Sequence, residues 1–122
     1  MTGDERRDFA ERLLDWYAHA KRDLPWRDID NPYAVFVSEV MLQQTQVATV
    51  GPYFERFLTA FPTVQRLAAA SEDDVLLCWQ GLGYYSRARR LRQAARRVVD
   101  VYDGLIPDTV EELRTLPGVG AY

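Results

Sequence analysis

The sequence contains a single cysteine, Cys78, among its 122 residues. One thiol allows neither an internal disulfide nor a metal site built from several cysteines. No apolar run approaches the length that crosses a bilayer, and the first residues lack the basic-then-apolar order of a signal peptide. We therefore expect no membrane association and a cytoplasmic location.

Alternating polar and apolar residues, internal repeats and low-complexity linkers are also absent. Hydrophobic residues make up 48% of the chain, which is enough for a packed core and too many for wholesale disorder. The apolar residues recur at three- and four-residue steps, which is the period of a helix. The sequence therefore predicts an all-α fold of one domain, or part of one.

Capping residues and prolines divide the chain into helices. A first amphipathic helix from Phe9 to Ala20 ends before Pro25, because a residue that precedes proline is pushed out of the helical region. Asn31 and Pro32 have the order of an N-cap followed by proline at the first helical position. Further boundaries are predicted at 49–52, 61–62, Thr63, Ser71 with Asp74, Gly81–Gly83, Asp103–Gly104, Thr109 with Glu112, and Leu116.

The net charge of −3 taken alone argues against binding of nucleic acid. That average conceals a local excess, since six arginines and no acid lie between Ser86 and Asp100. Phosphates respond to the field of the nearest patch, so the distribution of charge matters more than its sum. The arginine-rich helix is therefore a candidate DNA contact, with a merely solvated face as the alternative.

Glycines at Gly118 and Gly120 follow one predicted helix and precede another. They allow a close backbone approach, and a helix start directs N–H groups at an anion. This is the layout of a helix-hairpin-helix that holds a DNA phosphate. The alternative is an ordinary turn between helices, because short glycine motifs are common.

The stretch from Val37 to Gln46 places one acid, Glu39, among apolar residues and ends in three glutamines within four positions. A carboxyl group set among apolar side chains on a helix is a candidate general acid. The alternative is a glutamate on the solvent side of an amphipathic helix. Long amides suit hydrogen bonding to base edges, or they form a polar helix end.

Two aromatics, Tyr84 and Tyr85, follow a glycine-rich break and precede the arginines. An aromatic ring on such a turn can wedge between stacked bases, while Arg87 and Arg89 hold phosphates. Alternatively, both tyrosines pack into the core.

Taken together, Leu24–Arg27, Ser38–Gln46, Gly81–Arg89 and Leu116–Gly120 resemble, in order and spacing, the MutY adenine glycosylases of the endonuclease III superfamily. The resemblance runs from Leu13 to Tyr122. It implies a helical barrel, truncated here, that removes adenine mispaired with 8-oxoguanine or guanine from double-stranded DNA. It also implies that residues 1–22 form a helix belonging with a separate cluster domain, and that 23–122 form part of the barrel. The implied location is the bacterial nucleoid.

The resemblance also implies a role for individual residues. Glu39 matches the glutamate that protonates adenine, Gln44 a glutamine inserted near the damaged pair, and Tyr84 the aromatic wedge. Gly118 and Gly120 match the phosphate-gripping hairpin. The positions that line the adenine pocket match Arg22, Trp26, Arg27, Leu42, Val47 and Tyr122.

Tyr122 also bears on the reaction type. Endonuclease III enzymes carry a lysine there that attacks the sugar, so a tyrosine favours a monofunctional, hydrolytic glycosylase. The family's second acid, its 4Fe–4S cysteines and its 8-oxoguanine domain would all lie beyond Tyr122, so we expect an inactive N-terminal fragment with no cofactor or metal of its own. The alternatives are an endonuclease III-like pyrimidine-lesion glycosylase, a non-catalytic DNA-binding module and a helical protein-interaction domain.

Overall fold

The structure is a computed structural model that describes residues 31–43 and 45–119. The predicted N-terminal helix of residues 1–22 lies outside these ranges. The regular structure of the described residues is entirely helical, which confirms the all-α prediction. The helices are α2 (Pro32–Leu42), α3 (Val47–Ala60), α4 (Val64–Ala69), α5 (Glu72–Trp79), α6 (Tyr85–Val101) and α7 (Val110–Leu113). None of them is long and apolar enough to span a bilayer.

The predicted caps form where the sequence places them. The Asn31 side chain accepts a hydrogen bond from the Tyr33 backbone N–H at 3.0 Å, directly before Pro32 at the first helical position. The side chains of Thr63 at α4, Ser71 at α5 and Thr109 at α7 accept equivalent hydrogen bonds. Each of these bonds satisfies a backbone donor that the first turn of a helix leaves without a partner.

Two predicted boundaries are wrong. Helix α3 begins at Val47, so Pro52 lies inside the helix. Proline there removes one backbone bond, but the earlier start buries Val50 completely. Helix α7 ends at Leu113 because the chain tightens into i→i+3 bonds up to Leu116, the residue before a proline.

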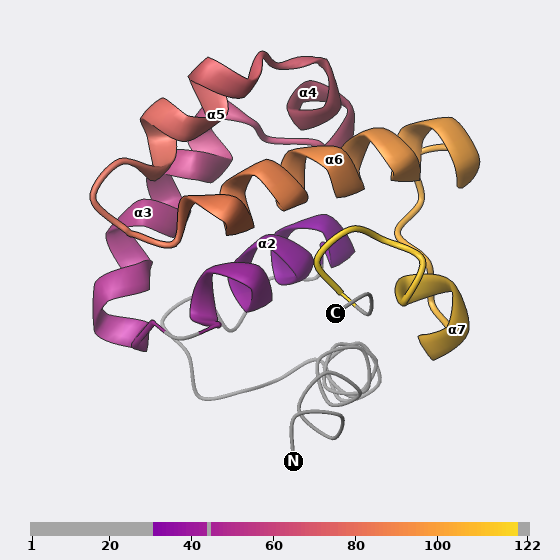
Figure 1. The fold of residues 1–122 in the computed structure, drawn as a ribbon, viewed down its shortest axis with the longest axis horizontal. Coiled ribbons are helices and arrows are strands. Elements are labelled where there is room, and N and C mark those ends of the chain that lie inside the picture. Colours follow the sequence, from indigo (N-terminus) through magenta and orange to yellow (C-terminus); the bar gives the residue numbers. More distant parts are fainter. Residues whose placement is uncertain (1–30, 44, 120–122) are drawn as a thin grey trace.

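Helix α6 crosses the middle of the molecule, with α4 and α5 on one side and α2 on the other (Figure 1). Helix α3 packs against both α2 and α5. Nine consecutive residues of α2, Tyr33–Met41, are buried, so this helix is covered on every side. Any polar side chain in the middle of α2 is therefore removed from water.

Tyr33 links the start of α2 to the end of α3. Its hydroxyl donates a 2.7 Å hydrogen bond to the carbonyl of Phe61, which follows the last turn of α3. Burial raises the pKa of the Tyr33 hydroxyl far above its ordinary value, so the group stays a neutral donor. This bond fixes the N-terminal end of α2, whereas the polar residues from Gln43 onward follow its C-terminal end.

Candidate active site

Glu39 lies in the buried middle of α2 with only 2% of its surface exposed. Val37, Val40 and Met41, its apolar neighbours in sequence, are buried with it. The interpretation of Glu39 as a solvent-facing glutamate is therefore wrong. A carboxyl group held away from bulk water on a rigid helix has the setting of a general acid.

The polar segment after Glu39 emerges at the junction of α2 and α3. Leu42, Thr45 and Val47 are half-buried, and Gln46 is exposed. Leu42, three residues after Glu39, and Val47, the first residue of α3, therefore flank this junction. The remaining predicted site residues of this part of the chain and of its two ends lie outside the described residues: Arg22, Trp26, Arg27, Gln44, Gly120 and Tyr122.

The break between α5 and α6 is a tight turn that presents a tyrosine. Gly81 has a φ of 98°, and a Cβ there would collide with the Tyr53 hydroxyl. Tyr84 itself has a left-handed φ of 53° and is 59% exposed. Tyr85 is also exposed, and its hydroxyl accepts a 3.2 Å hydrogen bond from the Gly81 N–H. The alternative in which both tyrosines pack into the core is therefore wrong.

Arg87 departs from the prediction of a phosphate contact. Its side chain is 7% exposed and reaches from the first turn of α6 to the end of α2. Burial lowers the pKa of its guanidinium from the ordinary value. The structure thus directs this cation into the protein, where a DNA phosphate does not reach it.

The two terminal nitrogens of the Arg87 guanidinium donate to neutral oxygens of the protein, whereas its buried Nε has no hydrogen-bond partner among the described residues. Nη1 donates to the carbonyls of Val40 at 3.1 Å, Met41 at 2.9 Å and Gln43. Nη2 donates to the Thr45 hydroxyl at 3.1 Å and lies 3.4 Å from the Gly83 carbonyl. The negative end of the α2 dipole therefore compensates the buried charge.

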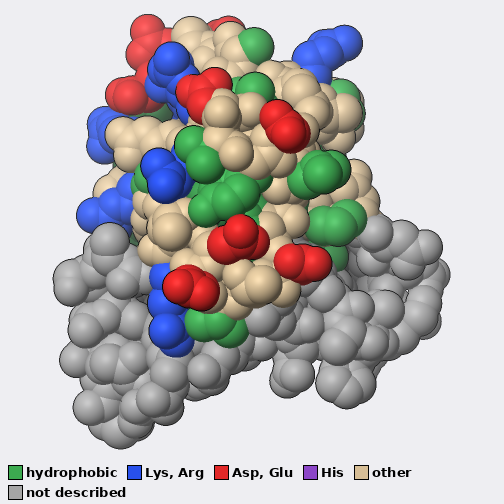
Figure 2. Space-filling view, turned by 90° about the vertical axis from the view of Figure 1, so that its right-hand side faces the viewer, with side chains coloured by type: hydrophobic (Ala, Val, Ile, Leu, Met, Phe, Trp, Pro, Cys, Tyr) green, Lys and Arg blue, Asp and Glu red, His purple; other side chains and the backbone are tan. Residues whose placement is uncertain are grey.

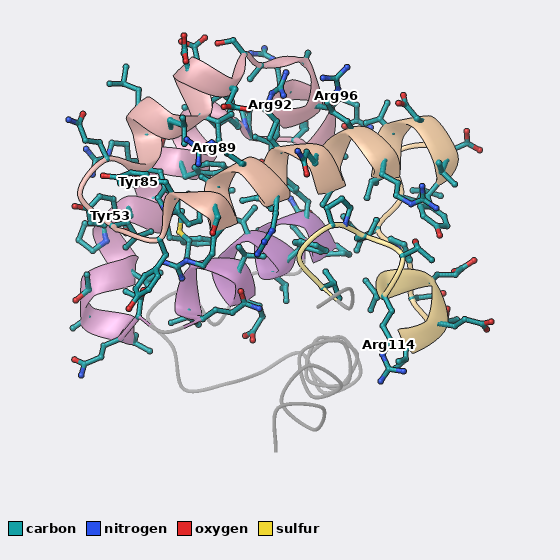
Figure 3. The ribbon with its side chains drawn as sticks, viewed as in Figure 1. Tyr53, Tyr85, Arg89, Arg92, Arg96 and Arg114 are labelled. Atoms are coloured by element: carbon teal, nitrogen blue, oxygen red, sulfur yellow. The ribbon has the colours of Figure 1, made fainter. Side chains whose placement is uncertain are left out.

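The other arginines of α6 divide between two sides of the helix. Arg89, Arg92 and Arg96 lie on the side toward α4 and α5 (Figure 3). There Arg89 Nε lies 3.3 Å from a Glu72 carboxylate oxygen, and Arg92 Nε donates to the Ala70 carbonyl at 2.8 Å. Arg89 is exposed, but this position turns it toward α5, away from α2.

Arg90 is the arginine next to the glycine turn. Gly118 has a φ of 85°, and a Cβ at this position would come within 3.1 Å of Arg90 Cβ. The Val119 N–H donates to the Leu116 carbonyl at 3.1 Å and closes the turn. Gln43, Arg90 and Gly118 border a small hollow between α2, α6 and the turn. A cation, an amide and a glycine backbone thus meet at one place.

Several acidic side chains lie around the C-terminal end of α6 and α7, at the opposite end of α6 from Tyr84. Figure 2 shows acids beside hydrophobic side chains on the face formed by the end of α6 and α7. The exposed acids of this region are Asp100, Asp103, Asp108, Glu111 and Glu112. The negative net charge of the chain therefore does not describe the local charge of the surface around Tyr84 and Arg90.

Two residues next to Arg87 and the 81–84 turn, Trp79 and Thr45, were not singled out from the sequence. Trp79 is completely buried, and its Nε1 donates to the Gly83 carbonyl at 2.9 Å, so it supports the turn that carries Tyr84. Thr45 accepts from Arg87. A tryptophan just before a glycine-rich break was the only local signal for either contact.

The residues of this chain do not suit an iron–sulfur cluster. Four thiolates hold such a cluster, whereas the sequence has one cysteine. Cys78 is partly buried against the core, and burial raises the pKa of its thiol. Within 31–43 and 45–119, no group of three or more potential metal ligands comes together.

Comparison of the sequence with known proteins shows the family to which the chain belongs. Residues 37–120, more than half of the chain, match the HhH-GPD superfamily of base excision DNA repair proteins, and the chain belongs to that family. It is 54% identical to the adenine DNA glycosylase of Rattus norvegicus over 93% of this chain and 24% of the rat protein. It is 46% identical to the adenine DNA glycosylase of Mycolicibacterium smegmatis over 90% of this chain and 38% of that protein. The predicted resemblance to adenine glycosylases is therefore confirmed.

Solved structures agree on the fold. A thermostable thymine-DNA glycosylase is 26% identical, with a TM-score of 0.73 over 98% of this chain and 55% of that chain. An endonuclease III trapped covalently on DNA is 23% identical with the same TM-score and coverage. The chain thus has the endonuclease III-like helical fold, and it spans about a quarter of the rat adenine glycosylase.

Proposed function

We propose that this chain supplies the helical DNA-binding and proton-donating part of a monofunctional adenine DNA glycosylase. Its substrate is double-stranded DNA with adenine opposite 8-oxoguanine or guanine. The observation that carries the proposal is the buried carboxyl of Glu39. It lies one helical turn before a polar segment that Arg87 connects to the exposed Tyr84. The adenine glycosylase relatives support the choice of base.

Glu39 has the position needed to protonate a base that has left the stack. The glycosidic bond is inaccessible inside a duplex, so adenine must be extruded into a pocket. Leu42 and Val47, at the junction after Glu39, form part of that pocket in the proposal, together with Arg22, Trp26, Arg27 and Tyr122. Protonation of the ring by Glu39 makes neutral adenine the leaving group, and water takes its place on the sugar.

DNA is held by its phosphates at the glycine turn. Gly118 allows a strand to approach the backbone, and Gly120 continues the same motif in the proposal. Arg90, exposed beside Gly118, supplies the cation there. Arg89 contributes less, because it already lies 3.3 Å from Glu72. Gln44 and Tyr84 are proposed to enter the duplex near the mispair.

The proposal assigns an iron–sulfur cluster, where a full-length relative holds one, to residues outside this chain. No step described for Glu39, Tyr84 or Arg90 depends on it. We also propose that the protein resides with the DNA, in the cytoplasm and nucleoid if the source is bacterial. The adenine glycosylase relatives include both bacterial and mammalian proteins.

The test is release of adenine by the full-length gene product that contains this sequence. Duplexes with a single adenine opposite 8-oxoguanine, guanine or thymine are incubated with excess protein, and abasic sites are cleaved with alkali and counted. We expect release from the first two duplexes and none from the matched one. Salt-sensitive binding without release would instead favour the non-catalytic DNA-binding module. Release of an oxidised pyrimidine would favour the endonuclease III-like alternative.

Replacing Tyr84 by Ala is expected to weaken binding to the mispair by about 1–3 kcal/mol, because alanine offers no ring to stack on a base. The exposed position of Tyr84 means that the fold should tolerate the change. Affinity for mispaired and matched duplexes is measured by fluorescence anisotropy. Tyr84→Phe, which keeps a ring at the same position, is the control and should keep the affinity. An unchanged preference for the mispair in Tyr84→Ala would remove Tyr84 from the recognition step.

A further inference from the structure

The unexpected burial of Arg87 needs an explanation other than binding of phosphate. A buried cation costs desolvation energy, and an apolar side chain of similar length would fill the same space without that cost. All the hydrogen-bond acceptors around the guanidinium are neutral carbonyls or a hydroxyl. What arginine provides here, and an apolar residue does not, is a planar fork with fixed bond directions.

That fork joins two separate parts of the site. On one side it holds the last carbonyls of α2 and the Thr45 hydroxyl, 42–47 residues earlier in the chain. On the other side it lies against the Tyr84 ring, with Cζ 5.2 Å from the ring centroid, and near the Gly83 carbonyl. The Trp79 ring, at 5.5 Å, also lies against the guanidinium. Arg87 is thus the one described residue hydrogen-bonded to both the α2 end and the Tyr84 turn.

Tyr84 particularly needs such support. Its backbone is left-handed, a conformation that costs free energy for a residue other than glycine. Its side chain is exposed, so few core contacts set its direction. The guanidinium plane is therefore a main determinant of where the ring points.

We infer that Arg87 is a positioning residue that fixes Tyr84 relative to the helix of Glu39, so that recognition of the mispair and proton donation occur in one geometry. The inference rests on the proposed function. The Arg87 side chain contacts the Tyr84 ring and also donates to the carbonyl of Gln43, four residues after Glu39. A displacement of Tyr84 by DNA would therefore be opposed by the end of α2. Arg87 touches neither the base nor the phosphate.

The test compares Arg87→Met, Arg87→Lys and Thr45→Val in the full-length gene product. Methionine keeps the length and removes the fork, lysine keeps the charge, and Thr45→Val removes a single acceptor. For a lost hydrogen bond to a charged group, we expect Arg87→Met to lose about ten- to a hundredfold in discrimination between mispaired and matched duplexes. Thr45→Val should show a smaller loss in the same direction, and it remains informative if Arg87→Met fails to fold. Arg66→Met, an exposed arginine on α4, is the matched control and should keep full discrimination.

Arg87→Lys separates positioning from charge and from general stability. An ammonium can satisfy a carbonyl at the end of α2, but it lacks the plane that supports Tyr84. We therefore expect its melting temperature to return toward that of the parent, whereas discrimination stays low. Recovery of both by lysine would overturn the inference, because charge alone would then suffice.

A double-mutant cycle with Tyr84→Ala gives the decisive readout. If Arg87 acts through Tyr84, Arg87→Met should cause little further loss of discrimination once the ring is gone. Losses that simply add would overturn the inference, as would parental discrimination in Arg87→Met and Thr45→Val. Failure of the proposed function looks different, since the parent protein itself would then release no adenine.

Discussion

Glu39→Gln should lower the single-turnover rate of adenine release by about a hundredfold to ten-thousandfold, the usual contribution of a positioned general acid. Glutamine has nearly the same size, so it can occupy the buried site on α2 where Glu39 is 2% exposed. It has no proton to give to the adenine ring. Affinity for the mispaired duplex should stay close to that of the parent, because Tyr84 and the phosphate contacts are untouched.

The matched control is Glu55→Gln, the same chemical change on an exposed position of α3. It should leave both the rate and the affinity unchanged. Rapid-quench kinetics with excess protein isolate the chemical step from release of product. If the Glu39→Gln protein releases adenine at nearly the parental rate, Glu39 only packs within α2. Another group must then be the proton donor.

The helix starts were predictable because a cap is a local structure. Asn31, Thr63 and Ser71 each bond to a backbone N–H two or three residues later, so the necessary partners stand side by side in the sequence. The break at Gly81–Gly83 was predictable for the same reason. Two boundaries without such a local cap were less predictable: α3 begins at Val47, since Pro52 is accommodated within it by the burial of Val50, and α7 ends at Leu113.

The position of Arg87 was not predictable from its neighbours. In sequence it is one of six arginines on a single helix, and only its distance from Tyr84 sets it apart. Its main partners lie at the end of α2, 42–47 residues away, and come into reach only when α2 packs beneath α6. A local excess of charge therefore indicated a basic helix, whereas tertiary packing decided which arginine turns inward.

The sequence pattern around Glu39 left two readings open, and burial separates them. One acid among apolar residues is compatible with a polar stripe on an amphipathic helix. Helix α2 has no such stripe, since Tyr33–Met41 are all buried. The periodicity of a helix that is covered on every side carries little information about which of its residues face the site.

Replacing Trp79 by Ala should lower the free energy of unfolding by about 3–5 kcal/mol, the usual cost of deleting a buried aromatic. Trp79 is completely buried, and its ring packs edge-on against Phe57 with centroids 6.0 Å apart. Since small domains are stable by only about 5–15 kcal/mol in total, this single change should bring the protein close to unfolding. Urea denaturation followed by circular dichroism measures the loss.

Trp79→Phe tests what the indole contributes beyond its volume. Phenylalanine keeps most of the apolar contact with Phe57 but removes the Nε1 donor, which bonds to the Gly83 carbonyl at 2.9 Å. We expect a smaller loss of about 1–3 kcal/mol, because that carbonyl keeps only the long 3.4 Å contact with Arg87 Nη2. The backbone N–H groups of the 81–84 turn should also exchange with deuterium faster than in the parent, whereas those of α4 should not. Unchanged exchange in the turn would mean that Trp79 fills space in the core and does not hold the segment that presents Tyr84.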